Sequence, residues 1–325
     1  MGEADRGDVW AVDMDLEKFL DTVNHSRLIR KLSTRIKDGR VLSLISRMLK
    51  SGVSVNGKVQ EPDVGLMQGG PLSPLLANIY LDELDKELEK RGHRFARYAD
   101  DLIILCKSKR AAQRTLTSVT RFVENRMKLK VNEAKTTVSY ITKGVKFLGH
   151  GFYKTKEGFF PTVHVKTKER LKGAIREILA RNRKKSIDTI KETLRRKLSG
   201  WCAYFKYAKD EKWAKDTDEW IRRRIRQLLG KTWKRIRTRQ AALRKPGCSE
   251  EKAYMWACTR KSYWRTANSH ILKTTLTNDF LESQGWCWLG LVRVDGDGGL
   301  NYGNRRKTPR EGHLPNGMGG GVRDR

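Results

Sequence analysis

Apolar and polar residues follow two different periods along the first half of the chain. Residues 10–15 (WAVDMD) alternate apolar and acidic side chains, which predicts a short strand that ends in carboxylates. Residues 24–49 have the three-to-four-residue apolar spacing of helices, and so does a segment that opens at QGGPLSP and runs to about Lys90. Between these helices, Asn56-Gly57 flanked by VSV and KVQ predicts a hairpin.

The pattern then returns to strands. Strands are predicted at 94–99 and 102–106, on either side of two adjacent aspartates, followed by a helix from about 110 to 127 and short strands through Phe152. The order strand, helix, strand, helix, strand, strand, helix, strand predicts an α+β fold in which helices cover one face of an antiparallel sheet.

Long basic helices dominate the second half. Apolar spacing predicts helices at 168–181, 187–207 and 218–239, with Ser186 and Thr217 as N-caps of the second and third. A fourth helical stretch is predicted at about 250–272. Beyond residue 290 the chain is rich in glycine and charge without periodicity, so we expect it to be disordered.

Charge sharpens this division. The net charge is +32, which indicates a polyanionic partner such as nucleic acid. Residues 1–150 carry 27 basic and 19 acidic groups, a net of +8, whereas residues 151–290 carry 35 and 14, a net of +21. Eight of the nine tryptophans also lie after residue 200. We therefore expect the two halves to have different roles.

Cysteine usage and hydropathy exclude other classes. The five cysteines form no CxxC pair, which argues against a disulfide framework and a zinc finger and fits a reducing compartment. No apolar run approaches the length of a membrane span, and the polar N-terminus does not resemble a secretory signal. We expect an intracellular protein with no membrane partner.

Three acids are candidates for chemistry. Asp15 ends one predicted strand, and Asp100 and Asp101 occupy the turn between two others. If these strands are neighbours, the carboxylates converge, and like charges so close need protons or cations among them. Two Mg²⁺ ions would meet this need. The alternative is that the two aspartates form a plain hairpin turn.

Five motifs bear on that choice: DMDLEKFLDTVNH (13–25), GLMQGGPLSPLLANIYLDELD (65–85), RYADDLIIL (97–105), LKVNEAKTTV (129–138) and VKFLGHGF (145–152). In order and spacing they resemble a reverse transcriptase palm, most closely that of bacterial group II intron-encoded proteins. Segments 217–239 and 259–272 resemble that family's thumb or maturase region. The resemblance covers about residues 4–285. It implies a palm at 1–152, a basic helical thumb/maturase domain at 153–245, a basic helical C-terminal region at 246–290 and a tail at 291–325.

The resemblance implies an RNA-directed DNA polymerase that uses two Mg²⁺ ions. It makes Asp15 and Asp100 metal ligands, Asp101 the third carboxylate, and Lys135 the proton donor to pyrophosphate. Residues near the incoming nucleotide would be Leu16, Leu20 and Gln68, with Leu20 standing where the family usually has an aromatic residue. Residues that contact template and primer would be Tyr98, Gly69, Gly70, Pro71, Phe147, Leu148 and Gly149.

A basic run supplies the candidate RNA contacts. Nine basic residues lie within positions 222–239 with no acid among them, and such a run would repel itself without a phosphate partner. The alternative is that these side chains only solvate exposed helix faces. The predicted RNA-binding residues are Arg222, Arg223, Arg226, Lys231, Lys234, Arg235, Arg237 and Arg239.

The partners that follow are group II intron RNA, an RNA template with a DNA primer, and a DNA target, with a homodimer left open. The expected location is the bacterial cytoplasm, with association to the nucleoid during mobility. The family normally has a fingers region before the segment that begins here, so we expect a palm that polymerises poorly alone. The second hypothesis is a non-catalytic RNA-binding splicing cofactor or truncated pseudo-enzyme. A retron or diversity-generating reverse transcriptase fits less well, because the thumb segments resemble the intron family.

Overall fold

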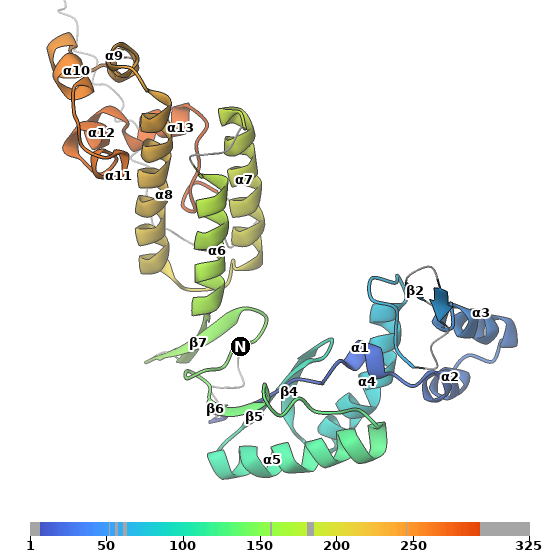
Figure 1. Cartoon of the computed structure of the whole chain (residues 1–325). Coiled ribbons are helices and arrows are strands. Elements are labelled where there is room, and N and C mark those ends of the chain that lie inside the picture. The colour runs from blue at the N-terminus through green and yellow to red at the C-terminus, as the bar shows by residue number, and fades with distance from the viewer. Residues whose placement is uncertain are drawn as a thin grey trace, which may run out of the picture.

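The computed structural model describes residues 7–51, 53–55, 58–60, 64–156, 158–180, 185–244 and 246–292. Figure 1 shows two parts: a sheet with packed helices, and an all-helical part joined to it through a β-hairpin and helix α6. The predicted α+β palm followed by a helical region is confirmed. The expected disordered tail lies outside the described residues from position 293 onward.

The palm is built on a four-stranded antiparallel sheet in the order β4-β5-β1-β6. Its strands are β1 (Trp10–Met14), β4 (Arg94–Tyr98), β5 (Asp101–Cys106) and β6 (Thr137–Tyr140). Strand β1 lies at the centre, where it pairs with β5 and β6. The apolar face of β1 packs in the main core of the palm, while its other face carries Asp13.

Helices α4 (Ser73–Lys90) and α5 (Lys109–Phe122), which continues into a π-helical turn η2 (Val123–Met127), cover one face of this sheet. The short α1 (Phe19–Thr22) leads to α2 (His25–Ser33) and α3 (Gly39–Leu49), which lie to the side of the sheet beyond α4 (Figure 1). Val12, Met14 and Leu16 point into this core together with Leu81 and Leu84 of α4. The hairpin predicted around residues 56–57 pairs β2 (Val53–Val55) with β3 (Lys58–Gln60), and its turn lies outside the described residues.

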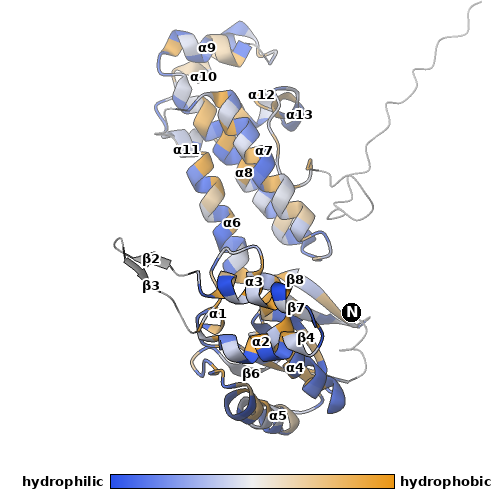
Figure 2. Ribbon diagram, turned by 90° about the vertical axis from the view of Figure 1, so that its right-hand side faces the viewer, coloured by the Kyte–Doolittle hydropathy of each residue, from blue (hydrophilic) through white to orange (hydrophobic). Residues whose placement is uncertain are grey.

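The other face of the sheet meets a second hairpin. Strands β7 (His150–Thr155) and β8 (Gly158–Val163) pair along their whole length. Phe147 and Phe152 pack with Ala11, Ile103 and Val145 beneath this hairpin. The chain passes from β8 directly into α6, so the hairpin connects the palm to the helical part (Figure 2).

The helical part has its own core. Its main helices are α6 (Val165–Ile178), α7 (Ile187–Tyr204) and α8 (Glu211–Thr232), followed by α9 (Ile236–Arg244), α10 (Glu250–Ala257), α11 (Tyr263–Thr266), α12 (His270–Thr275) and α13 (Asn278–Ser283). Residues 286–289 return into this core and are buried. Within the described part of the chain, no helix is both long and apolar enough to cross a membrane.

The predicted N-caps and helix bounds of the second half agree with the structure only in part. The N-cap at Ser186 is confirmed, since the Thr189 amide donates to its hydroxyl at 3.1 Å. The N-cap at Thr217 is wrong: α8 begins at Glu211, so Thr217 lies inside the helix and is fully buried. The helix predicted at 218–239 ends at Thr232 and resumes as α9, and the stretch at 250–272 is broken into three short helices.

Candidate active site

Strand register brings the acids to one face of the sheet. Asp13 pairs with Ile103 and Met14 with Leu102, so the next step along the ladder sets Asp15 opposite Asp101. Because side chains alternate between faces, Asp13, Asp15 and Asp101 share a face, and Val12 and Met14 take the other. Asp100 lies beside them in the β4–β5 turn.

The charges of these carboxylates raise one another's pKa values. Burial raises the pKa of Asp13 to about 6, and the charges of Asp101 and Asp15 add to the effect. Burial also raises the pKa of Asp101, and the charges of Asp100 and Asp15 contribute. Lys146 opposes both shifts. Asp13 was not among the acids singled out from the sequence, although its place two residues before Asp15 in an alternating strand is the signal that finds it.

Lys135 lies against this acidic group. Its Nζ is 3.2 Å from Asp15 Oδ2, and its side chain is 68% exposed. The backbone of Asp15 is fixed on both sides: its amide donates to Thr136 Oγ1 at 3.3 Å, and its carbonyl accepts from the Asn132 amide at 2.9 Å. Segment 132–136 therefore holds the end of β1, and the predicted proton donor already contacts a predicted metal ligand.

The turn that carries Asp100 has a strained backbone and is held to helix α4 by the side chain of Arg97. Ala99 has a φ of 53°, in the left-handed region that costs a non-glycine residue about 1 kcal/mol or more. Arg97 donates to the Ala99 carbonyl at 3.0 Å and to Asn78 Oδ1 at 3.0 Å, both from its Nη1. Its other nitrogens form a two-point ion pair with Asp85 of α4. Arg97 therefore ties the aspartate turn to the helix beneath it.

The chemistry of these residues fits a divalent cation. Carboxylate oxygens are hard ligands, and a bound cation would relieve the repulsion by Asp101 and Asp15 that adds to the effect of burial on the pKa of Asp13. Among the described residues no three His, Cys, Asp or Glu side chains form a ready ligand set. A Mg²⁺ ion at these acids would therefore take its further ligands from substrate phosphates and water.

The QGGP loop lies near the end of α1. Gln68 Nε2 donates to Asp21 Oδ1 at 3.3 Å. Gly69 has a φ of +82°, with open space where a Cβ would stand, whereas a Cβ on Gly70 would lie 2.9 Å from Ser73 Oγ. A side chain at position 70 would thus crowd Ser73, whereas the left-handed φ of Gly69 favours glycine and leaves its backbone open on the surface. Pro71 follows, just before the helix.

The three other residues assigned to nucleotide and primer lie in different surroundings. The side chains of Leu16 and Leu20 pack into the palm core, Leu16 fully and Leu20 in part, so Leu16 presents only its backbone outward. Tyr98 is 65% exposed at the end of β4, next to the aspartate turn. Of the three, Tyr98 alone offers an open side chain for a primer.

Phe147 to Gly149 form a tight turn at the junction with the helices. Phe147 and His150 exchange two backbone hydrogen bonds, while Leu148 and Gly149 both have positive φ, 50° and 79°. The Gly149 carbonyl accepts from Thr167 Oγ1 at 3.1 Å, and the Leu148 carbonyl accepts from the Tyr204 hydroxyl at 3.1 Å. The turn is thereby tied to both α6 and α7.

The predicted RNA-binding cations fall into two groups. Arg226 is buried and donates to the Leu276 carbonyl at 2.9 Å, so its place is in the helical core rather than on an RNA-facing surface. Arg239 donates to three backbone carbonyls, and Arg223 stacks on Trp264 with its guanidinium carbon 3.7 Å from the ring centroid. Arg222 lies over Trp288, and Lys231 is half-buried near the end of α8. The exposed cations are Lys234, Arg235 and Arg237.

Comparison with known proteins bears on this arrangement. Residues 2–152 match the family described as Reverse transcriptase (RNA-dependent DNA polymerase), and residues 168–247 match the Group II intron, maturase-specific domain. The chain is 28% identical to protein YkfC of Escherichia coli over 46% of its length and 48% of that protein. It is 26% identical to the group II intron-encoded protein LtrA of Lactococcus lactis subsp. cremoris, over 51% of its length and 38% of that protein.

The chain thus spans less than half the length of these two relatives. Among solved structures, apo telomerase from Candida tropicalis overlaps 80% of this chain and 53% of its own, at 13% identity and a TM-score of 0.41, a likeness too slight to carry an argument. The two family matches follow one another in the order of the palm and the helical part, and together they take in both the acidic group and α8. Residues 2–152 are therefore a reverse transcriptase domain, and residues 168–247 are a group II intron maturase-specific domain.

Proposed function

We propose that this chain supplies the catalytic palm and the RNA-binding maturase region of a group II intron reverse transcriptase. The observation that carries the proposal is the convergence of Asp13, Asp15 and Asp101 on one sheet face, beside the turn that holds Asp100. Such a face repels itself until cations bind, which suits polymerisation of nucleotides on an RNA template with a DNA primer.

The residues have separate roles in this proposal. Asp15, Asp100 and Asp101 would hold two Mg²⁺ ions, which when bound activate the attacking 3′-hydroxyl and stabilise the leaving pyrophosphate. Asp13 adds negative charge behind them. Lys135 Nζ, exposed and 3.2 Å from Asp15, can turn toward an arriving phosphate and deliver its proton. The Phe147–Gly149 turn, tied to α6 and α7, would position the primer backbone. The RNA template, the intron RNA and a DNA target are the partners of this proposal.

A primer-extension assay tests the catalytic half. The wild-type chain is given poly(rA)/oligo(dT), thymidine triphosphate and Mg²⁺. We expect weak incorporation that Asp100→Asn lowers at least a hundred-fold, since a metal site lowers the barrier by several kcal/mol. Asp82→Asn is the matched control, because it makes the same chemical change in the palm on a side chain that is 42% exposed. Equal loss in both variants would refute the assignment.

Direct measurement of metal binding separates this reading from the non-catalytic one. Mn²⁺ titration followed by electron paramagnetic resonance should show sites that weaken in Asp100→Asn and remain in Asp82→Asn. A chain that binds intron RNA tightly and with strong salt dependence, yet neither binds Mn²⁺ at these acids nor extends a primer, would be an RNA-binding splicing cofactor.

A further inference from the structure

A cavity of about 420 Å³ lies at the far end of the helical part, away from the acidic face. It is formed where α8 ends, by the start of α9, the end of α10 and the segment that leads through α11 to α12. None of the residues assigned to metal, nucleotide or primer lines it. Arg239 does, and its guanidinium is engaged with the protein itself.

The walls of this cavity are aromatic. Trp233, Trp256 and Tyr263 line it, and all three are half-buried, so none of them is fully covered by the protein. Flat rings that are held by packing but not covered are what an unpaired base stacks on. The cavity is too small for a helical stem and large enough for one base with its sugar.

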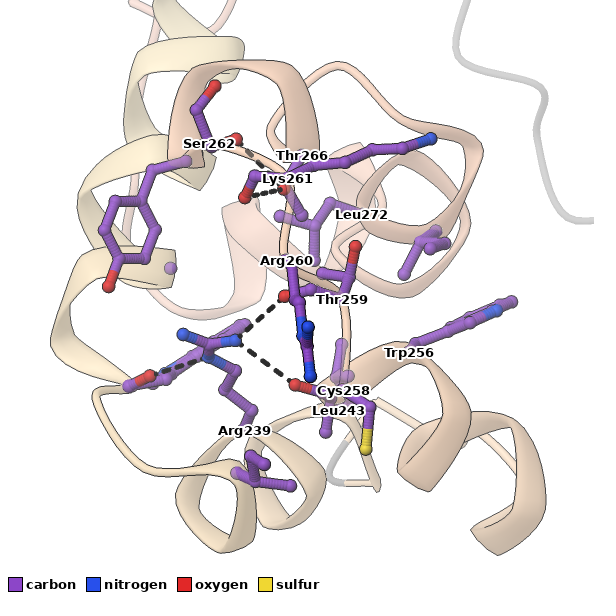
Figure 3. A pocket seen from close by; sticks show the side chains of 16 residues that line it. Arg239, Leu243, Trp256, Cys258, Thr259, Arg260, Lys261, Ser262, Thr266 and Leu272 are labelled. Atoms are coloured by element: carbon purple, nitrogen blue, oxygen red, sulfur yellow. Dashed lines mark hydrogen bonds between the residues drawn. The ribbon is translucent and has the colours of Figure 1, made fainter.

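Side-chain hydrogen bonds to backbone carbonyls tie the frame of the cavity together. The Arg239 guanidinium donates to the carbonyls of Trp233, Ala257 and Thr259 at 3.0, 3.2 and 3.3 Å. Thr266 Oγ1 donates to the carbonyls of Lys261 and Ser262 at 3.2 and 3.0 Å. Figure 3 shows these bonds on two sides of the opening, so the segment at 257–262 is fixed before anything binds.

The mouth is positively charged. Arg260 and Lys261 are exposed and border the cavity, and in the view of Figure 3 the Arg260 side chain lies between those of Arg239 and Trp256. None of the described residues that line the cavity is acidic. Guanidinium and ammonium groups beside stacking rings match the phosphate and base of one nucleotide.

We infer that this cavity captures a single unpaired nucleotide of a structured RNA: the base stacks on Trp256, with its phosphates against Arg260 and Lys261. The inference rests on the RNA-binding part of the proposed function and adds a site that reads the shape of the RNA. Bulged and looped bases are splayed out of RNA helices and can enter such a site, whereas bases within a paired stem cannot.

The test uses the full chain and two RNA hairpins, one with a single bulged 2-aminopurine and one with the same base paired. We expect the wild type to bind the bulged hairpin on the order of ten-fold more tightly, the size of one base–aromatic stack, and to quench its fluorescence. Trp256→Ala should remove the preference and the quenching while the paired hairpin binds as before. Trp256→Phe should keep both.

Tyr254→Ala is the matched control, because Tyr254 is 59% exposed on the same helix and does not line the cavity. Arg260→Ala should lower the dependence of binding on salt by about one phosphate contact. A wild type that binds both hairpins equally and leaves 2-aminopurine unquenched would overturn the inference and leave the RNA-binding function standing, even if Trp256→Ala failed to fold. Equal effects of the Trp256 and Tyr254 variants would overturn it too. A wild type that bound neither hairpin would instead overturn RNA binding itself.

Discussion

Replacing Arg97 by methionine should loosen the turn that carries Asp100 and leads into Asp101. The side chain of Arg97 is 11% exposed and forms a two-point ion pair with Asp85, whose side chain is 24% exposed. It also donates to Asn78 and to the carbonyl of Ala99, which is held in the left-handed region. Methionine keeps the apolar stem but removes every donor.

The size of the effect follows from these contacts. Removing one partner of a fully buried ion pair costs about 3–5 kcal/mol, because the other charge is left without compensation. Water reaches part of both side chains here, which reduces that cost to roughly 2 kcal/mol. Losing the charge-assisted bond to the Ala99 carbonyl adds about 1 kcal/mol. We therefore expect Arg97→Met to lower the free energy of unfolding by about 2–3 kcal/mol.

Urea denaturation gives the global change, and hydrogen exchange across β4 and β5 shows whether the turn opens first. Lys86→Met is the control: it removes an exposed i,i+4 pair with Asp82 on α4 and should cost under about 1 kcal/mol. Removing both partners, in Arg97→Met with Asp85→Leu, should cost less than the sum of the two single changes, since no charge is stranded. Additive costs, or an Arg97→Met variant as stable as the wild type, would refute the role of the Arg97–Asp85 ion pair in holding the turn.

Three further outcomes follow from the structure. Burial raises the pKa of Asp218 from 3.8 to about 6, so the folded state binds this proton more tightly than the unfolded state. The free energy of unfolding should therefore rise by up to about 3 kcal/mol as the pH falls from about 6 to 4. Asp218→Asn should flatten that rise when thermal unfolding is followed at several pH values. Arg226→Met should cost about 2–4 kcal/mol in urea, because its bond to the Leu276 carbonyl is buried, while RNA affinity per folded molecule stays unchanged in filter binding. Gly149→Ala should cost about 1–2 kcal/mol and slow primer extension more than it weakens primer binding, since its φ is +79° and its Cβ would lie 3.3 Å from Phe205.

Local pattern was enough to predict most of the palm. Alternation at residues 10–15 and apolar spacing at 73–90 both depend on neighbours a few positions apart, and β1 and α4 form where those patterns predict. The sequence also places Asp15 and Asp100 at the ends of strands, so the two acids can meet at one edge of the sheet. The palm could therefore be outlined before any contact was known.

Contacts between distant elements could not be predicted in the same way. The latch between Arg97 and Asp85 joins a strand to a helix face, and its partner is one of several acids on α4. The end of α8 at Thr232 depends on what packs around Trp233, including the Arg239 bond to its carbonyl. Periodicity continues through that point, because apolar spacing is indifferent to a bend that tertiary contacts impose.

The basic residues of the helical part show most clearly that contacts between distant elements cannot be read from local sequence, because tryptophans from other elements pack against them. A run of cations without acids should repel itself, which made a phosphate partner the natural prediction for all of them. The structure relieves much of that repulsion from within: Arg222, Arg223 and Arg224 lie over indole rings, contacts worth about 0.5–2 kcal/mol each.

Contacts with tryptophan rings distinguish the cations of α6 and α8 from the cations that follow α8. Lys168, Lys172 and Arg176 of α6 also lie over tryptophans of α8, so the excess of tryptophan and the excess of charge in this half of the chain have a common cause. The exposed cations that follow α8, Lys234 and Arg235 before α9 and Arg237 in its first turn, have no ring beneath them in the described structure. They follow Trp233, at the edge of the aromatic cavity, so the charge left for an RNA phosphate lies next to the rings left for an RNA base.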